Sequence, residues 1–458
     1  MDLILRGYHL NDSTWFYLSF LLILAVYFKF SRFWSIRNFD LVLLLSISPG
    51  LLLVRDKDPA MAAFGFAWLF VATALLLIRA LSDGLITRRP RLEQNMNAAG
   101  MVFLCAATFL FLTTKLLTEN PSESMVESVR RANNLVRGKP ATAMGDREET
   151  AEVEPVRAGP AASLVAGGVA QISKVVAQGN SATAASAADP DVVTARLIAI
   201  LAHLAVILGL TFVGRHIFGD PDVGFAMATL YMLLPCTAYD VGRINHVLPA
   251  ALVVWAIWAY RRPFVSGALL GLACAIMFFP IFLLPLWGVF YGKRGGIRFG
   301  TAVALTTAVI LSCLMLLSHD SKTVAQAMLG YVPLSELLDS ASKTGWWGTH
   351  EFAYIVPVFV TYLVMLVALT IWPRRKSLAH VIPASAAIII GTQFWYQDKG
   401  GVYVLWYLPL LLLVVFRPLM TNHFAPELKP LQFFQRLVGQ TPPQPELVGS
   451  SAENGSST

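Results

Sequence analysis

The sequence predicts an all-α polytopic membrane protein with about 11 spanning helices and a re-entrant pair of half-helices. Of its 458 residues, 56% are hydrophobic and only 14% are charged, whereas a water-soluble chain carries about 25% charged residues. The mean hydropathy is +0.61. This composition excludes a soluble globular enzyme and a nucleic-acid-binding protein, so the expected partners are membrane lipids and not a nucleic acid.

Eleven apolar runs account for the predicted spans. They lie at about residues 14–30, 39–54, 60–81, 98–117, 193–214, 222–238, 244–260, 299–318, 352–372, 378–395 and 401–417. The stretch from Ser266 to Tyr291 differs from them, because Pro280 and Pro285 interrupt it and both of its flanks are basic. We interpret it as two half-helices that fold back near Pro280.

Basic residues between the runs predict the orientation, since cytoplasmic loops retain Lys and Arg. With the re-entrant pair in place, all the basic clusters fall on one side: Lys29, Arg32 and Arg37; Arg79, Arg88, Arg89 and Arg91; Arg261 and Arg262; Lys293, Arg294 and Arg298; Arg374, Arg375 and Lys376. The expected localisation is therefore an inner (plasma) membrane, with an external N-terminus and a cytoplasmic C-terminus.

The chain divides into three parts by composition. Residues 1–97 carry three N-terminal membrane helices, residues 98–418 form the main membrane domain, and residues 419–458 read as a disordered cytoplasmic tail. A long polar loop at 118–192, rich in Ala, Gly, Ser and Glu in its second half, is expected outside the membrane. Within it, only Ala161 to Gln178 has enough Val, Leu and Ile for an amphipathic surface helix.

Polar residues in or beside a membrane bundle are costly, so they are the candidates for function. Glu123 and Glu127, four residues apart, would share one helical face, with Arg130 and Arg131 following; a solvated helix with ordinary ion pairs is the simpler interpretation. A second cluster, between two membrane helices, could hold a phosphate and hydroxyl groups, or could be a polar turn. It consists of Asp240, Arg243, Asn245 and His246.

Two further clusters fall in loops expected on the external side. Trp346 and Trp347 beside His350 could stack on a sugar ring, although paired tryptophans at a bilayer surface are usually interfacial anchors. Gln397 and Asp398 could contact a substrate or form a simple turn. The sequence lacks HExxH, CxxC, GxSxG and GxxxxGK[ST] patterns, so neither a metal site nor a resident cofactor is expected. His203 and His380, on apolar helices, are expected to be satisfied within the bundle.

The order of several short motifs resembles the GT-C superfamily of membrane glycosyltransferases, most closely the branch that uses polyprenol-phosphate-mannose. The resemblance covers about residues 98–418, which leaves the three N-terminal helices as an addition. It is carried by an Arg opening a helix, a Gly-Arg-x-x-Phe-Gly turn, a Pro-ending helix, an outer polar loop and a broken helix pair: Ala195-Arg196, Gly214-Arg215 to Gly219, Leu234-Pro235, Gly242 to His246, and Ser266 to Pro285.

The resemblance implies transfer of a sugar from a polyprenyl-phosphate-linked donor to an acceptor hydroxyl at the external face. It implies that Glu123, or Glu127 as second choice, is the general base, and that Arg243 and His246 hold the departing phosphate. The family's corner Lys is replaced here by Met277-Phe278-Phe279. Such departures leave a catalytically inactive GT-C-shaped binding or assembly protein as one alternative. A transporter or flippase is the other, because a re-entrant pair and His residues within the bundle would also suit one. The sequence names no sugar, acceptor or protein partner.

Overall fold

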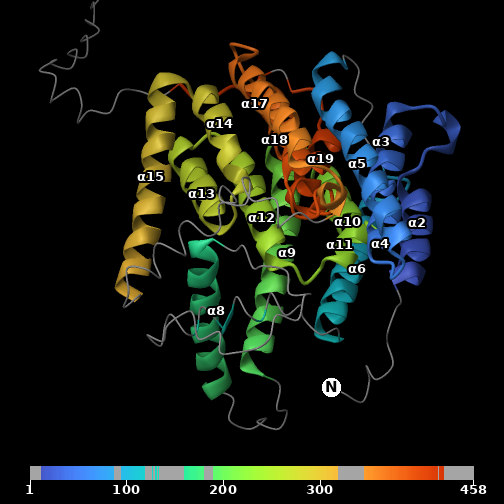
Figure 1. Ribbon diagram of the computed structural model, residues 1–458, viewed down its shortest axis with the longest axis horizontal. Helices are drawn as coiled ribbons and strands as arrows, with labels where there is room; N and C mark the ends of the chain where they lie inside the picture. Colours follow the sequence, from blue (N-terminus) through green and yellow to red (C-terminus); the bar gives the residue numbers. More distant parts are fainter. Residues whose placement is uncertain are drawn as a thin grey trace, which may run out of the picture.

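The computed structural model describes residues 12–86, 94–118, 126, 129–130, 133, 159–179, 189–317, 345–420 and 422–427. Within these ranges every regular element is a helix, which confirms the all-α prediction (Figure 1). Most of the predicted loop at 118–192, including Glu123 and Glu127, lies outside the described residues, and so does the tail from residue 428 onward.

The described helices account for most of the described chain. In order they are α2 (Asp12–Tyr27), α3 (Ile36–Leu45), α4 (Ile47–Val54), α5 (Pro59–Leu81), α6 (Ala98–Thr118), α8 (Pro160–Gly179), α9 (Pro190–His216), α10 (Pro221–Leu233), α11 (Pro235–Tyr239), α12 (Ile244–Trp258), α13 (Pro263–Ile276), α14 (Leu284–Phe290), α15 (Gly292–Leu317), α17 (Ile355–Ile371), α18 (Leu378–Trp395) and α19 (Leu408–Phe416). Three long helices begin with an Asp-Pro pair, in which the Asp side chain accepts a first-turn N–H: Asp58, Asp189 and Asp220.

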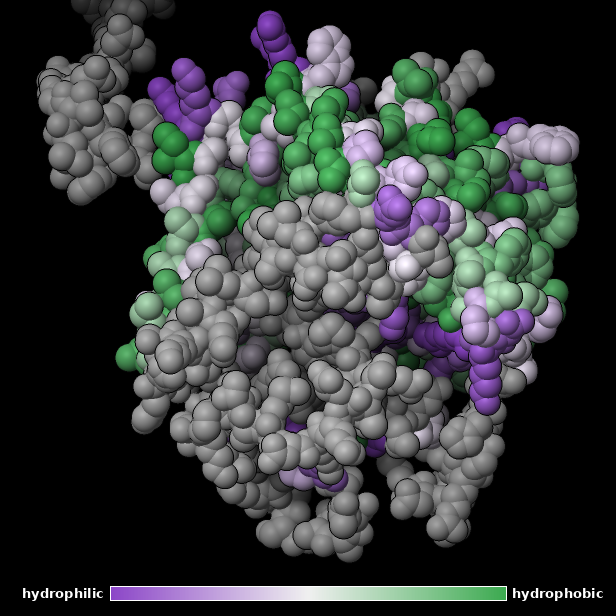
Figure 2. All heavy atoms as spheres, in the orientation of Figure 1, coloured by the Kyte–Doolittle hydropathy of each residue, from purple (hydrophilic) through white to green (hydrophobic). Residues whose placement is uncertain are grey.

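The chain is a multi-pass membrane protein. Six described helical stretches are long and apolar enough to cross a bilayer, and five shorter apolar helices accompany them. Along α17 the most exposed side chains recur every three or four residues and form a lipid-facing stripe of Val356, Val360, Val364, Val367 and Ile371. Figure 2 shows hydrophilic side chains along the upper edge and at the lower right, with hydrophobic surface between them.

The structure confirms the predicted re-entrant pair. α13 descends into the bundle, a 3-10 turn (η3, Phe279–Leu283) reverses the chain, and α14 returns beside it (Figure 1). Both outer ends pack against the first turns of α15: a Cβ on Gly267 would lie 2.4 Å from the Phe299 carbonyl oxygen, and one on Gly296 would lie 3.0 Å from that of Gly288. The two basic flanks of the pair therefore lie on the same side of the molecule.

Several helices end in the middle of the bundle instead of crossing it. The predicted run at 222–238 breaks at Pro235, which starts the short α11, and the run at 401–417 is helical only in a 3-10 turn (η7, Val404–Trp406) and in α19. The His203 Nε2 lies 2.9 Å from the Val241 carbonyl oxygen. Since His203 is 13 residues into α9, the turn after α11 lies roughly 20 Å from the start of α9.

The helix predicted at Ala161 to Gln178 forms, but its beginning is packed inside the molecule. The Gly159 N–H donates to the Ile276 carbonyl at 2.8 Å, at the end of α13. Ala161 and Ala162 are buried with Ile310 and Leu314 of α15. α8 therefore docks on α13 and α15 at its start, because small side chains there allow a close approach, and is not simply an interfacial surface helix.

A buried ionic cluster joins the N-terminal helices to the rest of the bundle. Arg79 of α5 donates to Asp40 of α3 and lies 3.2 Å from Asp83, whose other oxygen accepts from Arg417 after α19. All four side chains are at most 9% exposed. In addition, the Tyr27 hydroxyl donates to the Ala226 carbonyl of α10 at 2.8 Å. The first helices are thus an integral part of the membrane domain.

Candidate active site

Asp240, in the turn after α11, is the centre of the candidate site. It is 5% exposed, and its Oδ1 lies 2.8 Å from Arg55 Nη2 and 3.2 Å from Arg243 Nε. Two guanidinium groups therefore share one carboxylate oxygen. Asp240 therefore holds both guanidinium groups beside the turn after α11. The sequence predicted a phosphate-binding cluster in this turn.

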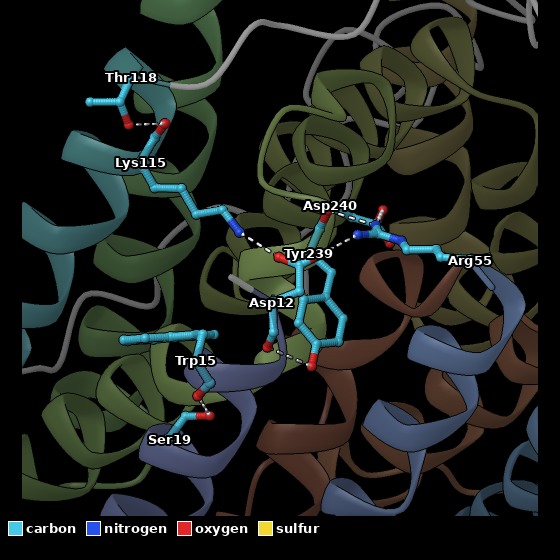
Figure 3. Close-up of polar contacts among 8 residues, drawn as sticks. All are labelled: Asp12, Trp15, Ser19, Arg55, Lys115, Thr118, Tyr239 and Asp240. Carbon is cyan, nitrogen blue, oxygen red and sulfur yellow. Dashed lines mark hydrogen bonds and ion pairs between the residues drawn. The ribbon is translucent and has the colours of Figure 1, made fainter. Parts of the chain in front are cut away.

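Arg55 comes from the N-terminal helices and links Asp240 to a second carboxylate (Figure 3). Its Nη1 lies 3.0 Å from Asp12 Oδ2, and its Nη2 also donates to the Tyr239 carbonyl at 2.7 Å. Lys115, at the end of α6, completes the group at 3.2 Å from Asp12 Oδ1. Three cations and two carboxylates from four separate elements thus meet in one place.

Asp12, Arg55 and Lys115 were not among the site residues that the sequence predicted. A signal was present for Lys115, because an ammonium inside an otherwise apolar run is costly and so needs a partner. For Asp12 and Arg55 the sequence indicated only that they lie at the ends of apolar runs. Many other charged residues of this chain lie in such positions. Their meeting depends on the packing of α2 and α4 against α11, which no local pattern encodes.

His246 lies at the first turn of α12 and is oriented by an aromatic cluster. The indole N–H of Trp406 donates to His246 Nδ1, so the neutral imidazole carries its proton on Nε2. Tyr403 stacks on Trp406 with ring centroids 4.6 Å apart and lies 5.1 Å from the His246 ring. The η7 segment therefore sets both the tautomer and the orientation of this histidine.

The structure brings the predicted Gln397–Asp398 cluster next to His246. The Tyr403 hydroxyl donates to Asp398 Oδ2 at 3.0 Å, and both Gln397 and Asp398 are buried. Tyr403 thus contacts both the predicted cluster around His246 and the predicted Gln397–Asp398 cluster, which are distant in the sequence. Asn245, beside His246, is half-buried.

The departure at the re-entrant corner has a structural reason. Phe279 stacks on Trp406 with centroids 4.7 Å apart, and Phe278 stacks on Tyr396 at 5.2 Å. The Met277-Phe278-Phe279 corner therefore supports the aromatic cluster that holds His246, in the place where the resembled family has a Lys.

The tryptophan pair lies against α5 and the end of α18. Trp347 is 3% exposed and its indole nitrogen donates to the Phe394 carbonyl at 3.0 Å. Trp346 stacks on Phe70 at 5.1 Å and on His350 at 4.7 Å. Since these contacts occupy the rings, the geometry favours a packing role for Trp347 over the predicted contact with a sugar.

The predicted bases Glu123 and Glu127 lie outside the described residues, but some of their neighbours are described. Asn133 Nδ2 donates to Asp191 Oδ1 at 2.7 Å, and Arg130 lies 3.3 Å from Asp189. Arg130 and Asn133 are thereby attached to the start of α9. The predicted pairing of Glu123 with Arg243 and His246 stays a prediction.

Among the described residues, no group of three His, Cys, Asp or Glu side chains could hold a metal ion. His203 is buried, with Nδ1 3.0 Å from the Tyr231 hydroxyl and Nε2 on Val241, so its role is packing within the bundle. The functional groups of the described candidate site are therefore guanidinium and ammonium cations, carboxylates, the His246 imidazole and the aromatic rings around it.

Comparison with known proteins connects this geometry to a family. Residues 187–394 match the family model of glycosyltransferase family 87, a family of the GT-C type. The matched segment includes Asp240, Arg243, His246 and the re-entrant pair, whereas Asp12, Arg55 and Lys115 lie outside it. No curated protein and no solved structure matches the chain. The match supports a GT-C-like membrane glycosyltransferase.

Proposed function

We propose that the protein transfers a sugar from a polyprenyl-phosphate-linked donor to a lipid or glycan acceptor at the external face of the membrane. The observation that carries this proposal is the cation group around Asp240. Asp240 and Arg243 lie in the segment matched to a glycosyltransferase family, and Arg55 lies outside it. The donor is expected to be a substrate lipid, with no resident cofactor.

The cation group suits the leaving phosphate. As the bond from the anomeric carbon to the phosphate oxygen breaks, the phosphate keeps the electron pair and gains negative charge. Arg243 is 25% exposed and Arg55 39% exposed at their side chains, so a ligand can approach both guanidinium groups while Asp240 holds them. Guanidinium groups placed in advance stabilise developing charge without reorganisation.

The acceptor hydroxyl needs a base that takes its proton as it attacks the anomeric carbon. Asp12 and Asp240 are unsuited to this role, because each of them is paired with two cations. We therefore assign the base to Glu123, with Glu127 as second choice. His246, with its proton on Nε2, would donate to the phosphate.

The orientation follows from the basic clusters. The flanks of the re-entrant pair lie at one end of the bundle, opposite the start of α9 and the end of α6 (Figure 1). Because basic loops are retained in the cytoplasm, the Asp240 turn would open toward the external side. This assignment agrees with a donor lipid used outside the cytoplasm.

The test is a turnover assay with the purified full chain in proteoliposomes. A panel of polyprenyl-phosphate sugars, each radiolabelled in the sugar, is supplied with a membrane extract as acceptor source. The proposal expects transfer of label to a new product from at least one donor. Donor binding without any product would support the inactive alternative, and gradient-driven sugar uptake without a covalent product would support the transporter.

A further inference from the structure

A cavity lies at the other end of the bundle, away from Asp240. It encloses about 320 Å³ between the ends of α5 and α17, the beginning of α18 and the middle of α14. The cavity reaches Ala384 on α18, and 11 residue steps of 1.5 Å, roughly 17 Å along the helix axis, separate Ala384 from Trp395 at the other end of α18. The cavity is therefore independent of the proposed transfer site.

The inner walls of the cavity are apolar and its lip is exposed. The walls include Leu286, Leu369 and Ala384, whereas Leu81, Leu85 and Trp372 at the lip are between 44% and 83% exposed. An exposed hydrophobic lip in a membrane protein faces lipid or the bilayer interface, where Trp is favoured. The cavity therefore opens toward the membrane rather than being sealed within the protein.

Lys376 places a single charge in this apolar surrounding. It is 6% exposed, and its ammonium donates to the Pro373 carbonyl at 2.7 Å. No described carboxylate forms an ion pair with it. Burial lowers the pKa of Lys376 from its ordinary value, since desolvation disfavours the charged form. A buried ammonium with one neutral acceptor has unused donors and an uncompensated charge, and an anion would satisfy both.

The neighbouring residues add to the positive charge. Arg374 and Arg375, in the same turn between α17 and α18, are exposed. This turn belongs to the basic end of the molecule, which by the positive-inside rule faces the leaflet richer in anionic lipid. The apolar walls, the buried cation and the basic rim therefore complement a ligand with a hydrocarbon part and an anionic head.

We propose that this cavity binds one anionic phospholipid, with an acyl chain against Leu286, Leu369 and Ala384 and its phosphate on Lys376. Arg374 and Arg375 would attract the head group from the interface. The protein would then hold an anionic lipid at one end of the bundle while the sugar chemistry takes place at the other. This inference stands whether or not the chain transfers a sugar.

The test uses native mass spectrometry of the full chain released from vesicles of equal parts phosphatidylglycerol and phosphatidylcholine. Wild-type protein should retain one phosphatidylglycerol in preference to phosphatidylcholine. Lys376→Gln should reduce that preference by about tenfold, the effect of losing a charge-assisted hydrogen bond. Arg294→Gln, which removes an exposed cation of the same end on α15, serves as the matched control and should keep it.

Two further arms make the outcome decisive. Ala384→Phe fills the cavity and keeps the charge, so it should displace the retained lipid even though Lys376 is present. Excess inorganic phosphate should leave the lipid bound, because the acyl chain contributes to binding. Equal phosphatidylglycerol retention by wild type, Lys376→Gln and Ala384→Phe would overturn the proposal, and displacement by inorganic phosphate alone would show a simple anion site instead.

Discussion

Arg55 Nη2 donates to Asp240 Oδ1 at 2.8 Å and so joins the N-terminal helices to the turn at the centre of the candidate site. Asp240 lies within the family-matched segment and Arg55 lies outside it. The three additional helices consequently do more than extend the bundle: they deliver one of the cations expected to meet the donor phosphate.

Replacing Arg55 tests this contribution. Arg55→Gln removes one charge-assisted contact to the phosphate, for which a loss of about 1.5–3 kcal/mol is typical. We expect kcat/KM for the lipid-linked donor to fall by about tenfold to one-hundredfold, with Arg55→Lys intermediate because it keeps the charge without the planar fork. Lys57→Gln, an exposed cation two residues away, should have little effect. Equal activity of all three variants would remove Arg55 from the site.

His246 can be dissected by two amide substitutions. Asn places its oxygen near the position of Nδ1 and keeps an acceptor for Trp406, whereas Gln places its amide near Nε2 and can donate to the phosphate. His246→Asn should retain the melting temperature and lose most transfer, while His246→Gln should be less stable and keep more transfer. A thermal-shift assay beside the turnover assay separates the two effects. The reverse order would mean that Nε2 does not contact the substrate.

Asp83 tests the buried ionic cluster that anchors the N-terminal helices. Asp83→Asn leaves the guanidinium groups of Arg79 and Arg417 without a shared carboxylate. Breaking a buried ion pair from one side costs about 3–5 kcal/mol, so unfolding in mixed micelles should occur at a clearly lower denaturant concentration. Asp56→Asn, an exposed control, should change stability by less than about 0.5 kcal/mol. Matching midpoints for the two variants would contradict the anchoring role.

Sequence patterns predicted the membrane class, the re-entrant pair and the polar turn at Asp240, because each depends on local composition. Length, apolar runs and flanking basic residues determine whether Ser266 to Tyr291 crosses once or returns, and the structure shows that it returns. The breaks in the runs at 222–238 and 401–417 were missed, since a proline within an apolar stretch can bend a helix as well as end it.

The remaining features of the site depend on contacts between distant segments. Arg55, one of the two cationic partners of Asp240, lies 185 residues away from it, and His246 depends on Trp406, 160 residues later. Nothing in the local sequence around Trp406 distinguishes it from the aromatic residues that pack elsewhere. The sequence predicted Asp240, Arg243 and His246 as a cluster but could not supply the residues that position them.

The most direct test of the central claim is the rate of sugar transfer by Glu123→Gln, measured with radiolabelled polyprenyl-phosphate sugar in proteoliposomes. The control is Glu119→Gln, which removes a carboxylate four residues earlier in the same segment. If Glu123 is the base, its loss should slow transfer by about 10²–10⁴-fold, with donor retention and the control unaffected. Transfer at the wild-type rate by Glu123→Gln would contradict the assignment of the base and the mechanism built on it.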